Sequence, residues 1–289
     1  MAVDGSRLES ELAGLDALEL AERSERGRLA RLWSSTWPKA AAIILSLVAW
    51  QAVVWSGWRP EYVLPPPGPV LSELADQMGT ADFWRAVGIT VRRALAGYLL
   101  AVVIGTVVGV AVARVKPLRV AVGSLITGLQ TMPSIAWFPL AILFFGLGEA
   151  AIMFVVVLGA APSVANGLIG GVDHVPPLLV RAGRSMGAGG LSLYRHVVLP
   201  ASLPAFVGGL KQGWAFAWRS LMAGELIVIV ANRPSIGANL QFARELANAE
   251  ALLATMIVIL VIGIVVDTAF GRADARIRNR FGLVDASAA

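Results

Sequence analysis

The sequence predicts an all-α membrane protein with six membrane-spanning helices. Hydrophobic residues make up 57% of its 289 residues and charged residues only 15%, a composition too apolar for a soluble protein of this length. Most of the uncharged runs approach the roughly 20 residues that a helix needs to cross a hydrocarbon core of about 30 Å. Open strands would leave backbone groups unpaired in lipid, and no ten-residue alternation indicates a barrel. The expected spans are 40–58, 94–113, 120–148, 150–172, 203–231 and 251–266.

The segment ahead of the first span, residues 1–39, is expected to be a tail. Seven acidic residues precede the first apolar run, which is not the pattern of a signal peptide. Leucines near helical spacing, such as Leu8, Leu12 and Leu15, would also fit an amphipathic helix on the membrane surface. The composition favours a solvated tail over that helix.

Prolines interrupt two of the central spans. Pro133 and Pro139 in the third span and Pro162 in the fourth each remove a backbone donor, so that the helix kinks or breaks. Irregular backbone at membrane depth is tolerated where it is buried in protein or lines a wet cavity. The prolines therefore either shape helix packing or line a pathway, and the pathway interpretation includes the neighbouring Met132 and Trp137.

The fifth span, 203–231, is apolar except for Lys211, Arg219 and Glu225. A charge at mid-membrane costs at least about 2.5–3.5 kcal/mol, so such a side chain normally faces protein or water. Six residues correspond to about 600° of helix rotation, and we expect Arg219 and Glu225 not to pair directly. Arg219, beside Trp218, could attract an anion, and Glu225 could brace a gate near the outer end. The alternative is that both are structural charges satisfied by another helix or by a second copy of the chain.

The distribution of basic residues predicts the orientation in the membrane. If the N-terminus is cytoplasmic, 16 arginines and lysines fall in inside loops and tails and only 6 fall outside. This bias favours cytoplasmic tails at 1–39 and 272–289 around a membrane domain at 40–271. The basic charge is spread over several loops, which argues against a nucleic-acid surface. The six residues expected outside are Arg59, Arg85, Arg92, Arg93, Arg233 and Arg244.

The inside loop at about 173–200 has its own predicted structure. Pro176 and Pro177 can begin a helix, because the first helical residues need no backbone donor. The glycine-rich stretch from Gly187 through Gly190 then breaks that helix, and a second short amphipathic piece runs from Leu191 through Tyr194 to Val198. Two short helices bent around a glycine, with arginines on the wet side, make a compact knob that fits a groove on another protein.

Several chemistries are excluded or disfavoured. The chain has no cysteine, and its two histidines, His174 and His196, are 22 residues apart, so we expect no metal site and no cofactor. None of its three lysines belongs to a Gly-Lys-Ser/Thr phosphate loop, so ATP would have to be hydrolysed by a partner. Residues 183–187 match the Gly-x-Ser-x-Gly pattern of hydrolases, but the residues before them are too short and Pro-rich for a central strand.

The loop resembles that of the membrane components of binding-protein-dependent ABC importers. The hallmark of that family is Glu-Ala-Ala, a glycine, and an apolar-Leu-Pro further on. Arg181-Ala182-Gly183 stands at the triplet, Gly187 at the glycine and Leu199-Pro200 at the end, with a Gly-to-Pro spacing of thirteen. Arg replaces Glu and Gly replaces the second Ala in the triplet. The resemblance assigns these residues and Tyr194 to coupling with an ATPase.

The chain from about Val63 to Arg280 is similar to the subgroup that carries sulfonates, taurine, nitrate and similar small anions. The matching segments are Leu64–Pro69, Thr90–Arg93, Met132–Pro139, Phe145–Gly148, Asn166-Gly167, Trp218-Arg219 and Gly224-Glu225.

The resemblance implies a permease dimer with two ATPase subunits inside and a solute-binding protein outside, within a bacterial plasma membrane. No covalent chemistry would occur in this chain, and ATP with Mg²⁺ would belong to the partner ATPase. An aliphatic sulfonate is the first substrate expected. Nitrate or bicarbonate, an aromatic acid or a pyrimidine precursor are alternatives in the same architecture. An ion-coupled secondary carrier is an alternative from another class, although paired inverted repeats and acidic ion sites are not evident.

Overall fold

The computed structural model describes residues 28–280, and every regular element in that range is helical. The prediction of an all-α fold is therefore confirmed for the described residues. The elements are α2 (Arg28–Trp55), α3 (Pro67–Met78), α4 (Ala81–Arg114), α5 (Lys116–Thr131), the 3-10 helix η1 (Ser134–Trp137), α6 (Phe138–Phe145), α7 (Glu149–Asp173), α8 (Pro177–Ser185), α9 (Gly190–Leu193), the π-helical η2 (Tyr194–Val198), α10 (Leu199–Ile227), α11 (Ile236–Glu245) and α12 (Ala249–Arg280).

The chain divides into two compact units, residues 1–68 and 69–289. In the first unit, α2 carries the first predicted span and begins at Arg28, within the predicted tail. The indole Nε1 of Trp50 donates to the Pro65 carbonyl at 3.1 Å, which ties the proline-rich loop to this helix. The first 27 residues of the predicted tail, with Leu8, Leu12 and Leu15, lie outside the described residues.

Six uninterrupted spans are only partly confirmed. Among the described residues, four helical stretches are long and apolar enough to cross a membrane: Trp37–Trp55, Ala81–Arg114, Glu149–Asp173 and Ala249–Asn279. The predicted span 120–148 is instead a broken pair, in which α5 and the segment Ser134–Phe145 meet at an angle of 105°. Pro133 ends the first helix of this pair, since it can donate no bond to the preceding turn. Of the two predicted effects of these prolines, a kink or a break, the third span shows the break.

Glycines bring α4, α7 and α10 into close contact. Along α7 and α10, Gly167 faces Gly209 and Gly171 faces Ser202, so the two helices run antiparallel. A Cβ added to Gly167 would lie 2.5 Å from the Gly209 Cα. α10 carries Lys211, Arg219 and Glu225 and is not among the four apolar stretches, although it packs closely along α7, which is one of them.

The predicted Gly-x-x-x-Gly of α4 packs inside the chain. Added Cβ atoms would approach the Ala161 carbonyl from Gly105 and the Ala165 carbonyl from Gly109, at 2.5 and 3.1 Å. These contacts run in the same order along both chains, so α4 and α7 are parallel. The motif therefore serves the core of one chain, whose buried side chains come mainly from α4, α7 and α10.

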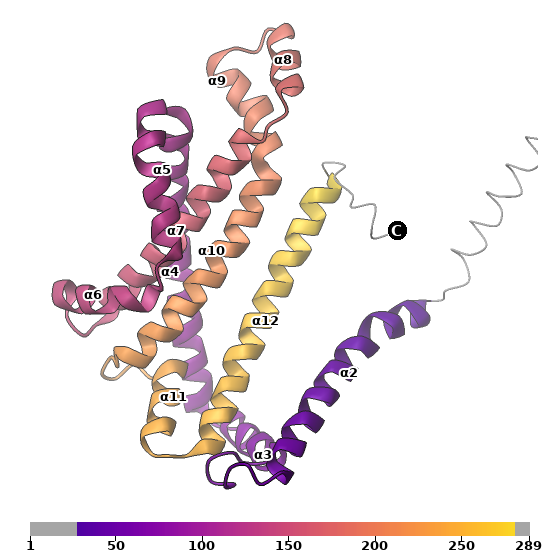
Figure 1. The fold of residues 1–289 in the computed structure, drawn as a ribbon, viewed down its shortest axis with the longest axis vertical. Helices are drawn as coiled ribbons and strands as arrows, with labels where there is room; N and C mark the ends of the chain where they lie inside the picture. The colour runs from indigo at the N-terminus through magenta and orange to yellow at the C-terminus, as the bar shows by residue number, and fades with distance from the viewer. Residues whose placement is uncertain (1–27, 281–289) are drawn as a thin grey trace, which may run out of the picture. The chain divides into compact units, whose positions relative to one another are not determined.

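The second unit has two distinct ends. Figure 1 shows α8 and α9 beside one end of the α7–α10 pair and α11 beside the other, and we call these the α8 end and the α11 end. α11 falls within the stretch 232–250, for which no element was predicted. Asn232 turns the chain with a φ of 59°, and the Ser235 hydroxyl caps the helix by accepting from the Ala238 amide at 3.3 Å.

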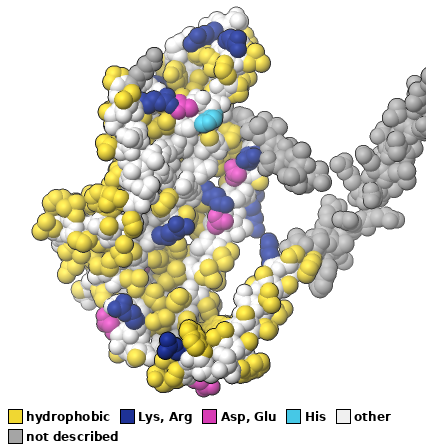
Figure 2. All heavy atoms as spheres, in the orientation of Figure 1, with side chains coloured by type: hydrophobic (Ala, Val, Ile, Leu, Met, Phe, Trp, Pro, Cys, Tyr) yellow, Lys and Arg dark blue, Asp and Glu magenta, His cyan; other side chains and the backbone are white. Residues whose placement is uncertain are grey.

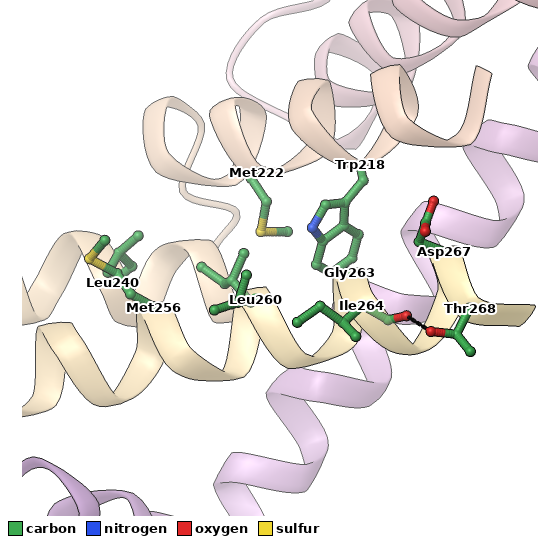
Figure 3. A pocket seen from close by; sticks show the side chains of 10 residues that line it. Trp218, Met222, Leu240, Met256, Leu260, Gly263, Ile264, Asp267 and Thr268 are labelled. Carbon is green, nitrogen blue, oxygen red and sulfur yellow. Dashed lines mark hydrogen bonds between the residues drawn. The ribbon is translucent and has the colours of Figure 1, made fainter. Parts of the chain in front are cut away.

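Aromatic side chains fill the space between α10, α12 and α4. Tyr98 lies edge-on to Trp214 at 5.3 Å, and Trp214 stacks on Trp218 at 6.2 Å. Beyond Trp218 a groove of about 600 Å³ runs along α10 and α12, with Met222, Gly263 and Thr268 among its lining residues (Figure 3). Its lining is almost wholly apolar, and Asp267 is its one charged residue.

Candidate functional site

The α8 end is a short helical knob with a glycine turn at its tip. α8 starts at Pro177, as predicted, and ends in a Schellman motif. In this motif the Gly187 amide donates to the Arg184 carbonyl and the Ala188 amide to the Gly183 carbonyl, both at 3.0 Å. Gly187 has a φ of 85°, a left-handed conformation that favours glycine. The left-handed backbone conformation thus explains why the sequence hallmark has a glycine at this position.

Close packing explains why Gly183 stands where the family hallmark has alanine. Gly183 is buried, and an added Cβ would lie 2.9 Å from both Leu193 Cδ1 and Val197 Cγ2. α8 therefore rests directly on α9 and η2. The Arg114 guanidinium lies 5.1 Å from the ring of the half-buried Tyr194, so the end of α4 also holds the knob.

The outer face of the knob presents basic and apolar side chains. Figure 2 shows Lys and Arg side chains gathered at this end of the molecule. Leu178 and Leu191 are each 71% exposed and Met186 is 87% exposed. Among the predicted coupling residues, Arg181, Ala182, Gly187 and Leu199 are exposed, Tyr194 and Pro200 are half-buried, and Gly183 is buried.

The broken third span and α10 meet around Gly159. A Cβ on Gly159 would lie 2.5 Å from Ser220 Oγ and 3.6 Å from Ser134 Cβ, so η1 and α10 approach α7 at one point. Next to this point Met132, Pro133 and Pro139 are exposed, while Trp137 is half-buried against the core. Three of the four residues predicted here for a pathway therefore lie on an open face.

The predicted pathway residues of α10 divide between two environments. Trp218 is buried in the aromatic cluster, whereas Arg219 is exposed on another side of the helix. The Arg219 guanidinium lies 5.8 Å from the Phe216 ring and has no ion pair with another described residue. Gln212, two turns earlier on the same side of α10, is also exposed, with the apolar Ala215 and Phe216 between them.

Glu225 lies at the α11 end, fully buried. Its carboxylate accepts hydrogen bonds from Arg93 Nη1 at 3.0 Å, from the Thr90 hydroxyl at 2.9 Å and from the Gly237 amide at 3.1 Å. The prediction that it does not pair with Arg219 is confirmed. Of the two interpretations for Glu225, these contacts fit a structural charge satisfied by another helix.

Arg93 extends this cluster to a second carboxylate. Its Nε and Nη2 donate to Glu149 Oε1 at 3.2 and 2.8 Å, and Arg233 Nη1 donates to the same oxygen at 2.9 Å. The Thr90 hydroxyl also accepts from the Ile236 amide, the first residue of α11, at 3.0 Å. We call Thr90, Arg93, Glu149, Glu225 and Arg233 the buried ion cluster. It joins α4, α7, α10 and α11.

Sequence reasoning missed the pairing in this cluster. Arg93 was placed among the outside arginines, and Glu149 was assigned no role. The available signal was the position of Arg93 within a long apolar helix, because a charge there requires a partner. The sequence offered no means of choosing Glu149 and Glu225 as those partners.

Other site classes find no support in the described part of the chain. It contains no group of three His, Cys, Asp or Glu side chains that could hold a metal ion. Ser185 of the hydrolase-like pattern ends helix α8, with no strand before it in the described residues, and His196 Nδ1 contacts the Ser192 carbonyl at 3.0 Å instead.

The described residues form a helical core with apolar helices of membrane-spanning length and an exposed two-helix knob at one end, an arrangement that fits a membrane permease. Residues 71–279 match the family described as the binding-protein-dependent transport system inner membrane component, and the chain belongs to this family. It is an inner membrane subunit of an ABC transporter and not an enzyme.

Two relatives and one solved structure agree with this assignment. The chain is 28% identical over 243 residues to the taurine transport system permease protein TauC of Escherichia coli K12, covering 80% of this chain and 87% of TauC. It is 26% identical over 221 residues to the putative aliphatic sulfonates transport permease protein SsuC of the same organism, covering 76% and 83%. An inward-facing structure of the MetNI methionine ABC transporter has the same fold, with a TM-score of 0.56, 21% identity, and coverage of 67% of this chain and 94% of that one.

Proposed function

We propose that this chain is the permease subunit of an ATP-driven importer for a small organic anion, first of all an aliphatic sulfonate. The observation that carries the proposal is the position of Arg219. It is an exposed, unpaired arginine on a helix that packs along a membrane span, beside the broken third span. A charged side chain that faced lipid would cost free energy, so we expect the exposed side of Arg219 to face water or a second copy of the chain. The substrate named for TauC and that named for SsuC are both sulfonates, which supports the choice of an anion.

The working complex would contain two copies of this chain, two ATPase subunits and an extracytoplasmic solute-binding protein, embedded in lipid. Both termini would be cytoplasmic, with tails at 1–39 and 272–289. The α8 end would then lie in the cytoplasm, where Leu178, Met186 and Leu191 would dock the ATPase. The α11 end would face the binding protein. ATP and Mg²⁺ would be bound by the ATPase alone.

The pathway would run past Met132, Pro133, Pro139 and Arg219. Trp137 and Trp218 would support this face from the core side, because both pack into the hydrophobic cluster. Glu225 would hold the α11 end together without touching the substrate, since its carboxylate is fully buried.

Uptake by the reconstituted complex tests the anion role. The complex is recovered by pull-down of this chain and placed in proteoliposomes with its binding protein. Arg219→Ala should abolish uptake of radiolabelled ethanesulfonate while the subunits still co-purify. Arg276→Ala, an exposed arginine near the end of α12, serves as the control and should transport like the wild type. Wild-type uptake by Arg219→Ala would refute the anion role.

The substrate class is tested on the binding protein that co-purifies. Its thermal stability is measured with alkanesulfonates, taurine, nitrate and aromatic carboxylates. Stabilisation by sulfonates alone is expected. Stabilisation by another class of compound would leave the permease assignment unchanged and would identify that class as the substrate. Recovery of neither an ATPase nor a binding protein would favour a secondary carrier.

A further inference from the structure

A small pocket at the α11 end is lined by three arginines. Its volume is about 150 Å³, enough for a sulfonate or phosphate group with its nearest carbons. Arg92 and Arg93 of α4, Glu149 of α7 and Arg233 of the α10–α11 loop form its polar wall, with Ile89 and Met153 among its apolar walls.

The positive charges of this pocket outnumber the negative ones. Glu149 accepts from Arg93 and Arg233, and Glu225 accepts from Arg93 behind the pocket. Arg92 is exposed and has no hydrogen bond or ion pair with any other described residue. Three guanidinium groups thus lie near only two carboxylates, which are paired with Arg93 and Arg233, and one net positive charge remains.

The fold leaves the pocket open. Nearer the α8 end, α5 covers the groove between α4 and α7, where Val122 and Ile126 lie against Val108 and Ala165. Beyond the bend of 105°, α6 turns away, as Figure 1 shows, and no residue of α5 or α6 lines the arginine pocket. A small ligand can therefore reach Arg92 and Arg233 without displacing a helix.

We propose that this pocket binds a singly charged oxyanion, either a soluble sulfonate or the phosphodiester of a lipid headgroup. Among the described residues, none accepts from Arg92 and Arg233 uses one donor, and planar guanidinium groups match two oxygens of such an anion. Arg93 is already held by both carboxylates, so it adds charge and fixes the wall. The choice of a sulfonate as the soluble anion rests on the proposed function, whereas the site itself does not.

Calorimetric titration of the full chain tests the site. The chain is purified in dodecyl maltoside micelles, which carry no phosphate, at low ionic strength and titrated with ethanesulfonate and with its uncharged counterpart ethanesulfonamide. The sulfonate should bind in the millimolar range, about −4 kcal/mol, and the sulfonamide should not bind measurably. Arg92→Gln should weaken sulfonate binding about tenfold or more. Arg85→Gln changes an exposed arginine on the same helix outside the pocket and should leave binding unchanged.

Either equal binding by the wild type and Arg92→Gln or no binding by the wild type would overturn the site. A second arm adds phosphatidylglycerol to the micelles and measures lipid retention by native mass spectrometry. Retention that Arg92→Gln abolishes, together with weakened sulfonate binding, identifies a lipid headgroup as the ligand. Sulfonate binding unaffected by phosphatidylglycerol identifies the soluble anion.

This titration contains neither ATPase nor transport. If Arg219→Ala abolishes uptake but the wild type shows no binding here, the pocket proposal fails alone. If binding occurs here and Arg219→Ala transports normally, the proposed pathway role fails alone.

Discussion

The two ends of the α7–α10 pair are held together by opposite means. The α8 end relies on shape: a glycine turn at Gly187 and a glycine contact at Gly183 let two short helices pack, and their apolar side chains point outward. The α11 end relies on charge, with Arg93 and Glu225 buried and joined to Glu149 and Arg233.

The α8 end therefore offers a surface for a partner protein, whereas the α11 end holds helices of the same chain together. The knob leaves Leu178, Met186 and Leu191 exposed, so these apolar side chains would be buried only by contact with another molecule. The buried ion cluster satisfies its central charges internally and ties four helices at one place. Substitutions should therefore affect partner binding at the α8 end and stability of the chain at the α11 end.

The largest expected effect follows loss of the central carboxylate. Glu225→Ala leaves the Arg93 guanidinium partly unpaired in a buried site, and we expect a loss of about 3–5 kcal/mol of stability. Size-exclusion chromatography after heating would show a much lower melting temperature for the purified chain. Arg219→Ala, six residues earlier and exposed, is the matched control and should melt like the wild type. Equal melting of both variants would mean that the cluster does not fasten this end.

A smaller loss is expected between the two ends. Gly209→Ala places a Cβ 2.6 Å from the Gly167 Cα, so α7 and α10 must separate, at a cost of about 1–3 kcal/mol. Gly208→Ala meets nothing within 4 Å and should be neutral. Thermal melting of the pair measures the difference. Similar melting of these neighbouring variants would show that the helices can part freely.

At the α8 end, the effect should be local. Gly187→Ala forces an alanine into the left-handed region at a cost of about 1 kcal/mol. Hydrogen exchange of amides 183–190 should accelerate and ATPase co-purification should decrease, with the global melting temperature nearly unchanged. Gly189→Ala also meets open space but has a φ of −130°, so it should behave like the wild type. A bulky Gly187→Trp should reduce ATPase association further; undiminished association would remove the docking role.

The smallest effect is expected from an exposed ion pair between the ends. Lys211 Nζ lies 3.1 Å from Asp267 Oδ1, with side chains 42% and 63% exposed. Lys211→Gln should change stability by about 0.2–1 kcal/mol or less in detergent, because exposed pairs are weak. A decrease in melting temperature as large as that of Glu225→Ala would mean that ion pairs stabilise α10 along its whole length and not only at the α11 end.

The sequence predicted those parts of the fold that depend on local rules. Apolar runs located α4, α7 and α12, and the prolines and glycines of 176–190 located the ends of α8. The prolines predicted a kink or a break in the third span but not the 105° angle, because a proline does not determine how far the next helix turns. α11 was missed because it is short, and Arg93 was left without partners because pairing across 132 residues is a property of the tertiary fold.

For the site, the sequence located residues better than it assigned their environments. Arg219 and Glu225 were expected on different faces from helix geometry alone, and the contacts agree. Trp218 and Arg219 were grouped because they are adjacent, yet adjacent helical residues point about 100° apart, and one lies in the core while the other is exposed.

The glycine contacts along α4, α7 and α10 leave these helices little freedom to slide or bend separately. α10 has 29 residues and is about 43 Å long, so it acts as a lever arm between the knob and the buried ion cluster. A tilt of about 10° about one end would move the other by about 7 Å at that length. Because the three helices are packed along their lengths, a tilt that starts at the knob would therefore displace the α11 end as well.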